Sequence, residues 1–109
     1  MPIPGAIALL IGSGQVTAAG NTQLIAPHEN RRLLLNYVSY NPNAAAEVGV
    51  RFGETGPIFL RNDLVAPMSV IAKDFGDFRF LLGGVGEALY LNQNNAVKTN
   101  WTVFYQESP

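Results

Sequence analysis

The chain has 109 residues, which allow one hydrophobic core and are too few for two. It is 48% hydrophobic but only 14% charged, whereas an average soluble domain has about 25% charged residues. A formal net charge of −1 argues against a nucleic-acid partner, which a basic surface would bind, and the absence of cysteine excludes disulfides and thiolate metal sites.

The first residues differ in character from the rest of the chain. Residues 1–5 contain two prolines and are expected to form an extended arm, whereas residues 6–109 are expected to form a single domain. The start lacks the basic residues of a signal peptide, and the apolar run Ala6–Ile11 is too short to span a membrane. We therefore expect a protein that is made and folded in a cytoplasm and has no membrane partner.

Two glycine-rich stretches separate strand candidates. Ala6–Ile11 is a short apolar strand that ends at Gly12–Gly14, and Gly83–Gly86 precedes the last third of the chain. A phosphate-binding loop needs a helix after its glycines, and no helical pattern follows either stretch. Both stretches are therefore predicted to be joints between strands.

The middle of the chain contains a second strong strand candidate. Arg31–Tyr40 is rich in leucine, valine and tyrosine and ends at Asn41-Pro42-Asn43. The next run, Glu47–Phe52, alternates apolar and polar residues as a half-buried strand does. Because only a short loop separates the two runs, they are predicted to form an antiparallel pair. Pro67 then marks an edge strand or a crossing connection.

The last third of the chain carries the clearest strand signal. Glu87–Asn92 and Val97–Gln106 are joined by a polar turn and are predicted to form a hairpin. In the second run, alternate residues fall on opposite faces of a sheet. The face predicted to be covered carries Val97, Thr99, Trp101, Val103 and Tyr105, and the other carries Lys98, Asn100, Thr102, Phe104 and Gln106.

The chain as a whole therefore predicts an all-β fold with about eight short strands and little or no helix. Glycine, proline and asparagine punctuate the strands at close spacing, and apolar residues nowhere persist at helical spacing. An antiparallel two-sheet sandwich of jelly-roll or Greek-key type follows from this pattern.

The sequence shows no recognisable catalytic, cofactor-binding or metal site. His28 is the only histidine, whereas zinc chemistry usually needs two or three such ligands. The acidic residues that we considered for calcium lack the spacing of a calcium loop: Glu54, Asp63, Asp74, Asp77 and Glu87. We expect no enzyme and no cofactor. The alternative is a small hydrolase, which would need a cleft with two titrating carboxylates.

A surface with so few charges must consist of neutral polar and apolar groups, which indicates assembly with a partner. Tyr40, Tyr90 and Phe104 fall on strand faces opposite the predicted core, where rings either anchor a protein contact or stack on sugars. A contact is favoured, because no amides and carboxylates are visibly clustered beside them. Arg31 and Arg32 open a strand and would either protect a sheet edge or form an inter-subunit ion pair. The candidate interface residues are Ile3, Pro4, Arg31, Arg32, Tyr40, Tyr90 and Phe104.

Five segments together carry a resemblance to a protein family: 30–35, 49–52, 56–60, 86–92 and 101–107. Over residues 30–107 the chain resembles the small all-β proteins of the structural gene modules of tailed bacteriophages, several of which are head decoration or capsid cement proteins. The resemblance implies a virion protein, made in the host cytoplasm, that assembles as a trimer or dimer and clamps neighbouring copies of the major capsid protein. A tail-associated or carbohydrate-binding module is the alternative.

Overall fold

The computed structural model describes residues 9–56, 58–65, 71–74 and 81–108, and in these residues the protein is all-β with no helix. The all-β class expected from the sequence is therefore confirmed. The arm predicted for residues 1–5, and Pro67, lie outside the described residues.

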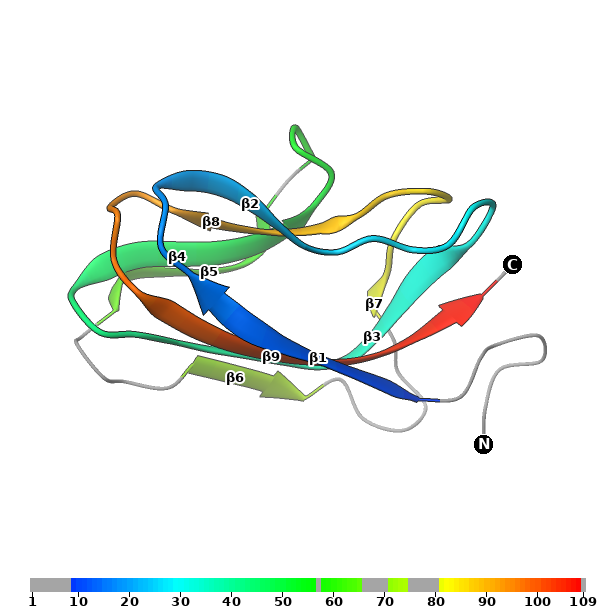
Figure 1. The fold of residues 1–109 in the computed structure, drawn as a ribbon, viewed down its shortest axis with the longest axis horizontal. Coiled ribbons are helices and arrows are strands. Elements are labelled where there is room, and N and C mark those ends of the chain that lie inside the picture. The colour runs from blue at the N-terminus through cyan, green and yellow to red at the C-terminus, as the bar shows by residue number, and fades with distance from the viewer. Residues whose placement is uncertain (1–8, 57, 66–70, 75–80, 109) are drawn as a thin grey trace.

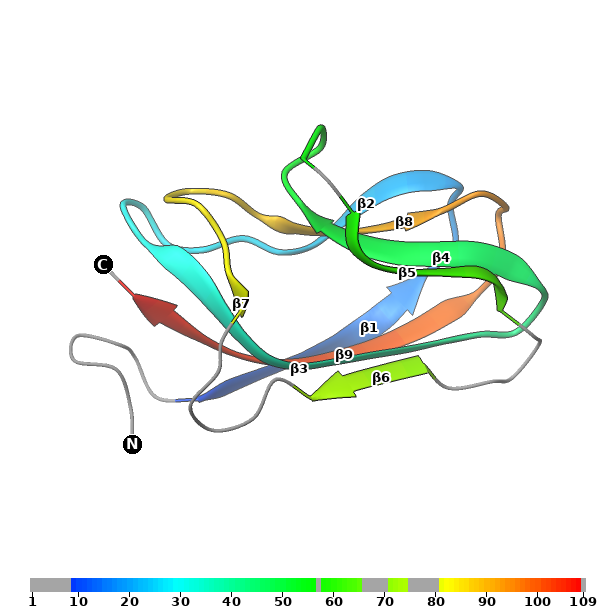
Figure 2. The same cartoon turned by 180° about the vertical axis from the view of Figure 1, so that it is seen from behind.

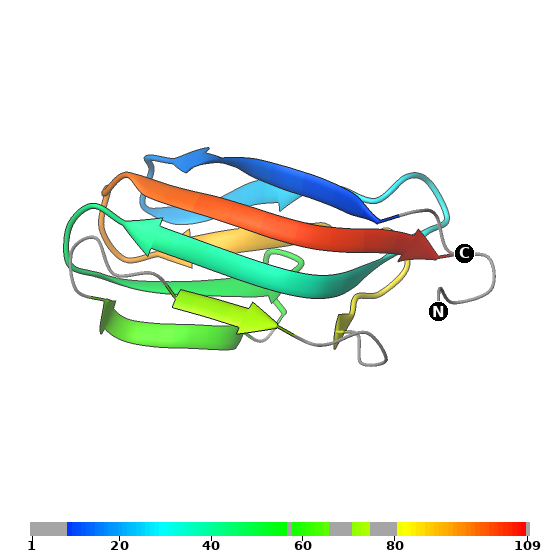
Figure 3. The ribbon, with the colours of Figure 1, turned by 90° about the horizontal axis from the view of Figure 1, so that it is seen from below.

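Nine strands are present in the described residues, one more than expected, and they form two antiparallel sheets. The strands are β1 (Leu10–Val16), β2 (Gly20–Ile25), β3 (Arg32–Pro42), β4 (Ala46–Phe52), β5 (Ile58–Val65), β6 (Ile71–Asp74), β7 (Leu81–Leu82), β8 (Leu89–Gln93) and β9 (Thr99–Ser108). Sheet A has the order β1-β9-β3-β6, with β7 also paired to β3, and sheet B has the order β2-β8-β4-β5. The two sheets lie as two layers in Figures 1 and 2, and Figure 3 shows β9 and β3 in the interior of sheet A.

Strand pairing is nested along the chain. β1 pairs with β9, β2 with β8, β3 with β6 and β7, and β4 with β5. Two further pairings, β3 with β9 and β4 with β8, complete the sheets. Both hairpins predicted from the sequence are therefore wrong, because β3 and β4 lie in different sheets, as do β8 and β9. Alternation identifies the buried face of a strand, but the backbone hydrogen bonds that choose its neighbour leave no trace in that pattern.

The core lies between the two sheets. The last strand buries the face that the sequence predicted as far as Tyr105, with Val103 fully buried and Trp101 and Tyr105 packed against the core. Gln106, which was predicted on the other face, is also buried, so the prediction is wrong at that residue. The buried core residues are Val16, Ile25, Leu33, Leu35, Val38, Tyr40, Ala46, Val48, Val50, Leu89, Leu91 and Val103. Both sheets contribute residues to this core, because each sheet needs the other to cover its apolar face.

A buried polar cluster holds the crossing from β8 to β9. Gln93 at the end of β8 and Thr99 at the start of β9 are 1% and 0% exposed. The Thr99 hydroxyl donates to Gln93 Oε1 at 2.6 Å, and Gln93 Nε2 donates to the carbonyl oxygens of Ala18 and Val97 at 3.0 and 2.9 Å. Because buried polar groups must find partners, these bonds tie the turn after β1 to the turn after β8.

A register shift in β3 changes which residues face the core. The pairing with β9 skips Asn36, as in a β-bulge, which inserts one residue into a strand. Leu35 therefore faces the core before the shift, and Val38 and Tyr40 face it afterwards. The prediction that Tyr40 lies opposite the core is wrong: its side chain is 1% exposed and its hydroxyl donates to the carbonyl of Val48 at 3.2 Å.

Gly12 and Gly14 lie inside β1, so the prediction that Gly12–Gly14 joins two strands is wrong. Both glycines face the indole of Trp101 on β9. A Cβ on Gly12 would lie 3.3 Å from that ring, and one on Gly14 would lie 3.2 Å from it. Because glycine has no side chain, Gly12 and Gly14 leave room for the indole ring of Trp101, which packs against the core.

Candidate functional site

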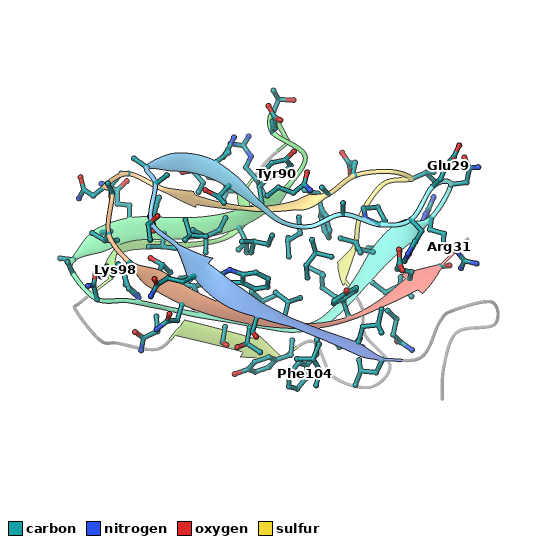
Figure 4. The ribbon with its side chains drawn as sticks, in the orientation of Figure 1. Glu29, Arg31, Tyr90, Lys98 and Phe104 are labelled. Atoms are coloured by element: carbon teal, nitrogen blue, oxygen red, sulfur yellow. The ribbon has the colours of Figure 1, made fainter. Side chains whose placement is uncertain are left out.

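The outer face of sheet A carries an apolar row across three strands. Ile11 on β1, Phe104 on β9 and Tyr37 on β3 are neighbours in register. Ile11 is 67% exposed, and the rings of Tyr37 and Phe104 lie 5.1 Å apart between centroids. Figure 4 shows Phe104 pointing away from sheet B. Leu9, which is 53% exposed, extends this apolar surface at the start of β1.

Two neutral polar rows continue the same face. The first consists of Ser13, Thr102 and Ser39, and the second of Gln15, Asn100 and Asn41. None of these side chains is charged, and Gln15 donates to the side chain of Asn100 at 3.1 Å. We call these two rows together with the apolar row the neutral face of sheet A. A neutral face costs less to remove from water than a charged one, so it suits contact with another protein.

The outer face of sheet B carries a different arrangement, which we call the Tyr90 cluster: Asn21, Gln23, Glu54, Tyr90 and Asn92. The hydroxyl of Tyr90 lies 3.4 Å from Gln23 Oε1 and 3.2 Å from Glu54 Oε1, to either of which it can donate. Asn92 donates to the Asn21 side chain at 2.8 Å, and Asn21 donates to the Glu54 carbonyl at 3.0 Å. Desolvation, followed by the charge of Glu54 and its hydrogen bond, raises the pKa of Tyr90. The cluster therefore presents a tyrosine side chain bordered by amides and a carboxylate. Figure 4 labels Tyr90 on β8.

A third arrangement lies where β9 ends. The carboxylate of Glu107 is only 2% exposed. It accepts the backbone N–H of His28 at 2.5 Å, and the Nδ1 of the exposed His28 ring lies 2.7 Å from it. Desolvation, with the charge of Glu107 second, raises the pKa of Tyr105. These bonds hold the loop before β3 against β9.

The structure separates the predicted interface residues. Ile3 and Pro4 lie outside the described residues. Tyr90 and Phe104 lie on the outer faces of different sheets, so they cannot contribute to one contact surface. Tyr40, which the sequence placed with them, belongs to the core.

Arg31 and Arg32 do not protect a sheet edge. β3 lies inside sheet A, and Arg32 is opposite Ser108 on β9, so edge protection is wrong for this pair. The carbonyl of Arg31 accepts the N–H of Gly86 at 2.8 Å, which fixes the turn before β8. An inter-subunit ion pair from these arginines stays a prediction.

Two of the five acidic residues considered for a metal or hydrolytic site have described side chains, and they make unrelated contacts. Glu54 belongs to the Tyr90 cluster, while Glu87 accepts the N–H of Gly84 at 2.8 Å. Within the described residues, no three His, Cys, Asp or Glu side chains gather in a group that could hold a metal ion. The described part of the chain also contains no helix that is long and apolar enough to cross a membrane.

Asn21, Gln23 and Asn92 were missed in the sequence, and Glu54 was considered only for a metal or hydrolytic site and was not linked to Tyr90. Asn21 and Gln23 are two apart on a weak strand, which was the available signal, but the pairing of β2 with β8 could not be read from it. No protein-family model matches this chain, and no curated protein matches it in sequence.

Proposed function

We propose that this chain is a structural protein of a phage virion, a capsid decoration protein that binds the major capsid shell and stabilises it. The observation that carries the proposal is the neutral face of sheet A, on which three strands present one apolar row and two uncharged polar rows. The core of a protein interface is typically depleted of charge and enriched in aromatic side chains, as this face is.

A protein of this kind works by passive binding and needs no reaction. Phe104 and Ile11 would be buried against the capsid protein, and the uncharged rows around them would be desolvated at little cost. A stable contact buries about 800 Å² on each partner, and repetition over a shell multiplies modest contacts into high avidity. The resemblance to phage decoration proteins supports the same role.

We further propose that the two sheets form a β-sandwich of jelly-roll type. The nested pairing supports it, because β1 with β9, β2 with β8, β3 with β6 and β7, and β4 with β5 describe one long ribbon folded back on itself. Pairing of β3 with β9 and of β4 with β8 rolls that ribbon into two layers. Viral capsid and lectin domains both use this architecture.

The capsid proposal is tested by adsorption to expanded capsids of the same phage. Wild-type protein is expected to bind them and to raise their resistance to heat. Phe104→Ser is expected to bind about tenfold more weakly, because it removes the centre of the apolar row. Asn100→Ser is the matched control, since Asn100 lies on the same strand and face in a polar row. Failure of wild-type protein to adsorb, or equal losses in both variants, would refute the proposal.

The Tyr90 cluster favours a second candidate function, carbohydrate binding. Sugars are recognised by an aromatic ring on which they stack and by amides and carboxylates that pair with their hydroxyl groups. The cluster brings one tyrosine, three amides and one carboxylate together from β2, β8 and the loop after β4. Sequence reasoning favoured protein contact because such groups were not visibly adjacent.

A glycan array separates the two functions. If the cluster binds a sugar, wild-type protein labels a defined set of glycans and Tyr90→Ala labels them about tenfold more weakly. Tyr37→Ala is the control, because Tyr37 is a partly exposed tyrosine on the outer face of the other sheet. An array with no bound glycan excludes this second function and leaves the capsid proposal intact.

A further inference from the structure

One side of the molecule is formed by two edge strands without charge. β1 ends sheet A and β2 ends sheet B, and the two strands lie on the same side of the layers (Figure 1). Residues 1–27 of the sequence contain no Asp, Glu, Lys, Arg or His. Among the described residues, β1 pairs only with β9, so the opposite edge of its backbone has no strand beside it.

The opposite edges of the two sheets are built differently. β5, which has eight residues, carries Arg61 and Asp63, and β6, which has four, carries Lys73 and Asp74. Natural proteins protect exposed sheet edges with charge, proline or bulges, because an unpaired edge is a template for another strand. β1 has none of these: its sequence LIGSGQV is uncharged and free of proline, and its register with β9 is continuous from Leu10 to Val16. By contrast, β2 carries a register shift between Gln23 and Ile25.

We propose that the β1 edge pairs antiparallel with β1 of a second copy of this chain, so that sheet A continues through both subunits. The strand is self-complementary when the pair is centred on Ser13. Leu10 then meets Val16 on the core-facing side, and the exposed Ile11 meets Gln15 on the outer side. Such a contact uses the same surface twice, as a two-fold dimer requires, and seven paired residues extend over roughly 24 Å.

This inference rests on the assembly expected of the proposed decoration protein. The pairing uses the free backbone edge of β1, whereas the capsid contact would use the outward side chains of β1, β9 and β3. The occupant is a second copy because β1 is uncharged, free of proline and continuous in register, and its pairing with itself sets Leu10 against Val16, Gly12 against Gly14 and Ser13 against Ser13. Because sheet A would continue from one subunit into the other, the neutral faces of the two subunits would lie side by side. A dimer would therefore present a doubled neutral face.

The experiment measures mass in solution by light scattering and uses cysteine crosslinking to report the pair. Wild-type protein is expected at twice 11.8 kDa, and Ser13→Lys at 11.8 kDa, because two lysines would face each other at the centre of the new pair. Thr102→Lys is the matched control: Thr102 is the β9 neighbour of Ser13 on the same face but not on the edge, so this variant should stay dimeric. Since the chain lacks cysteine, Ser13→Cys should form an inter-subunit disulfide under mild oxidation and Thr102→Cys should not.

The outcomes test edge pairing and capsid binding independently of each other. A monomeric wild type, a dimer that Ser13→Lys leaves intact, or a dimer lost only in Thr102→Lys would overturn edge pairing. Adsorption is measured with wild-type protein, because Ser13 lies on the neutral face: a wild-type dimer that fails to adsorb to capsids would support edge pairing and refute the capsid role. A wild-type monomer that adsorbs to capsids would overturn edge pairing and support the capsid role.

Discussion

Replacing Glu107 with alanine is expected to lower the free energy of unfolding by about 2–3 kcal/mol. The Glu107 carboxylate is 2% exposed and accepts the backbone N–H of His28 at 2.5 Å, with the imidazole Nδ1 at 2.7 Å. Truncation would leave this partly buried N–H without its acceptor and release the loop before β3 from β9. Urea unfolding at neutral pH measures the loss.

Two variants separate the parts of this contact. His28→Ala keeps the backbone bond and removes only the ring, which is 78% exposed, so it is expected to cost well under 1 kcal/mol. Glu107→Gln keeps an oxygen acceptor of similar shape and is expected to fall between the two. If Glu107→Ala were as stable as wild-type protein, the carboxylate would not hold the loop.

Removing the hydroxyl of Tyr40 is expected to reverse its effect on stability between neutral and alkaline pH. At pH 7, Tyr40→Phe loses the hydrogen bond to the Val48 carbonyl and should be less stable by about 1 kcal/mol. Burial raises the pKa of Tyr40 from 10.0 to about 12. Its neutral form is therefore favoured in the folded state, and its contribution is complete below pH 10.

As the pH rises from 10 to 12, the unfolded state loses the Tyr40 proton first, and wild-type protein should lose about 2 kcal/mol of stability from this residue. Tyr40→Phe has no such proton, so it should become the more stable protein above roughly pH 11. Urea unfolding of both proteins between pH 7 and pH 12 checks the crossover. The comparison cancels the other tyrosines, which titrate in both proteins. Parallel stability curves would contradict a buried Tyr40 hydroxyl.

The candidate surfaces were only partly predictable. Phe104 and Tyr90 lie on outer faces, as their positions in alternating strands indicated. Tyr40 was misplaced because a single skipped residue, Asn36, exchanges the faces of every later residue in β3. The neighbours of Tyr90 come from β2 and from the loop after β4. The hydrogen-bond partner of the buried Glu107 carboxylate is His28, which lies 79 residues earlier in the chain. Such groupings depend on strand pairing, which local pattern does not contain.

The sequence by itself determined that the chain is all-β. It also determined which face of β9 is covered from Thr99 to Tyr105, because alternation with a period of two is a local property of a strand with one covered face. Tertiary structure decided which strands are neighbours. Consecutive strands β3 and β4, and likewise β8 and β9, cross between sheets, while β1 pairs with β9 at the far end of the chain. Every backbone offers the same N–H and C=O groups, so the choice of partner is made only when both sheets bury their apolar faces against each other.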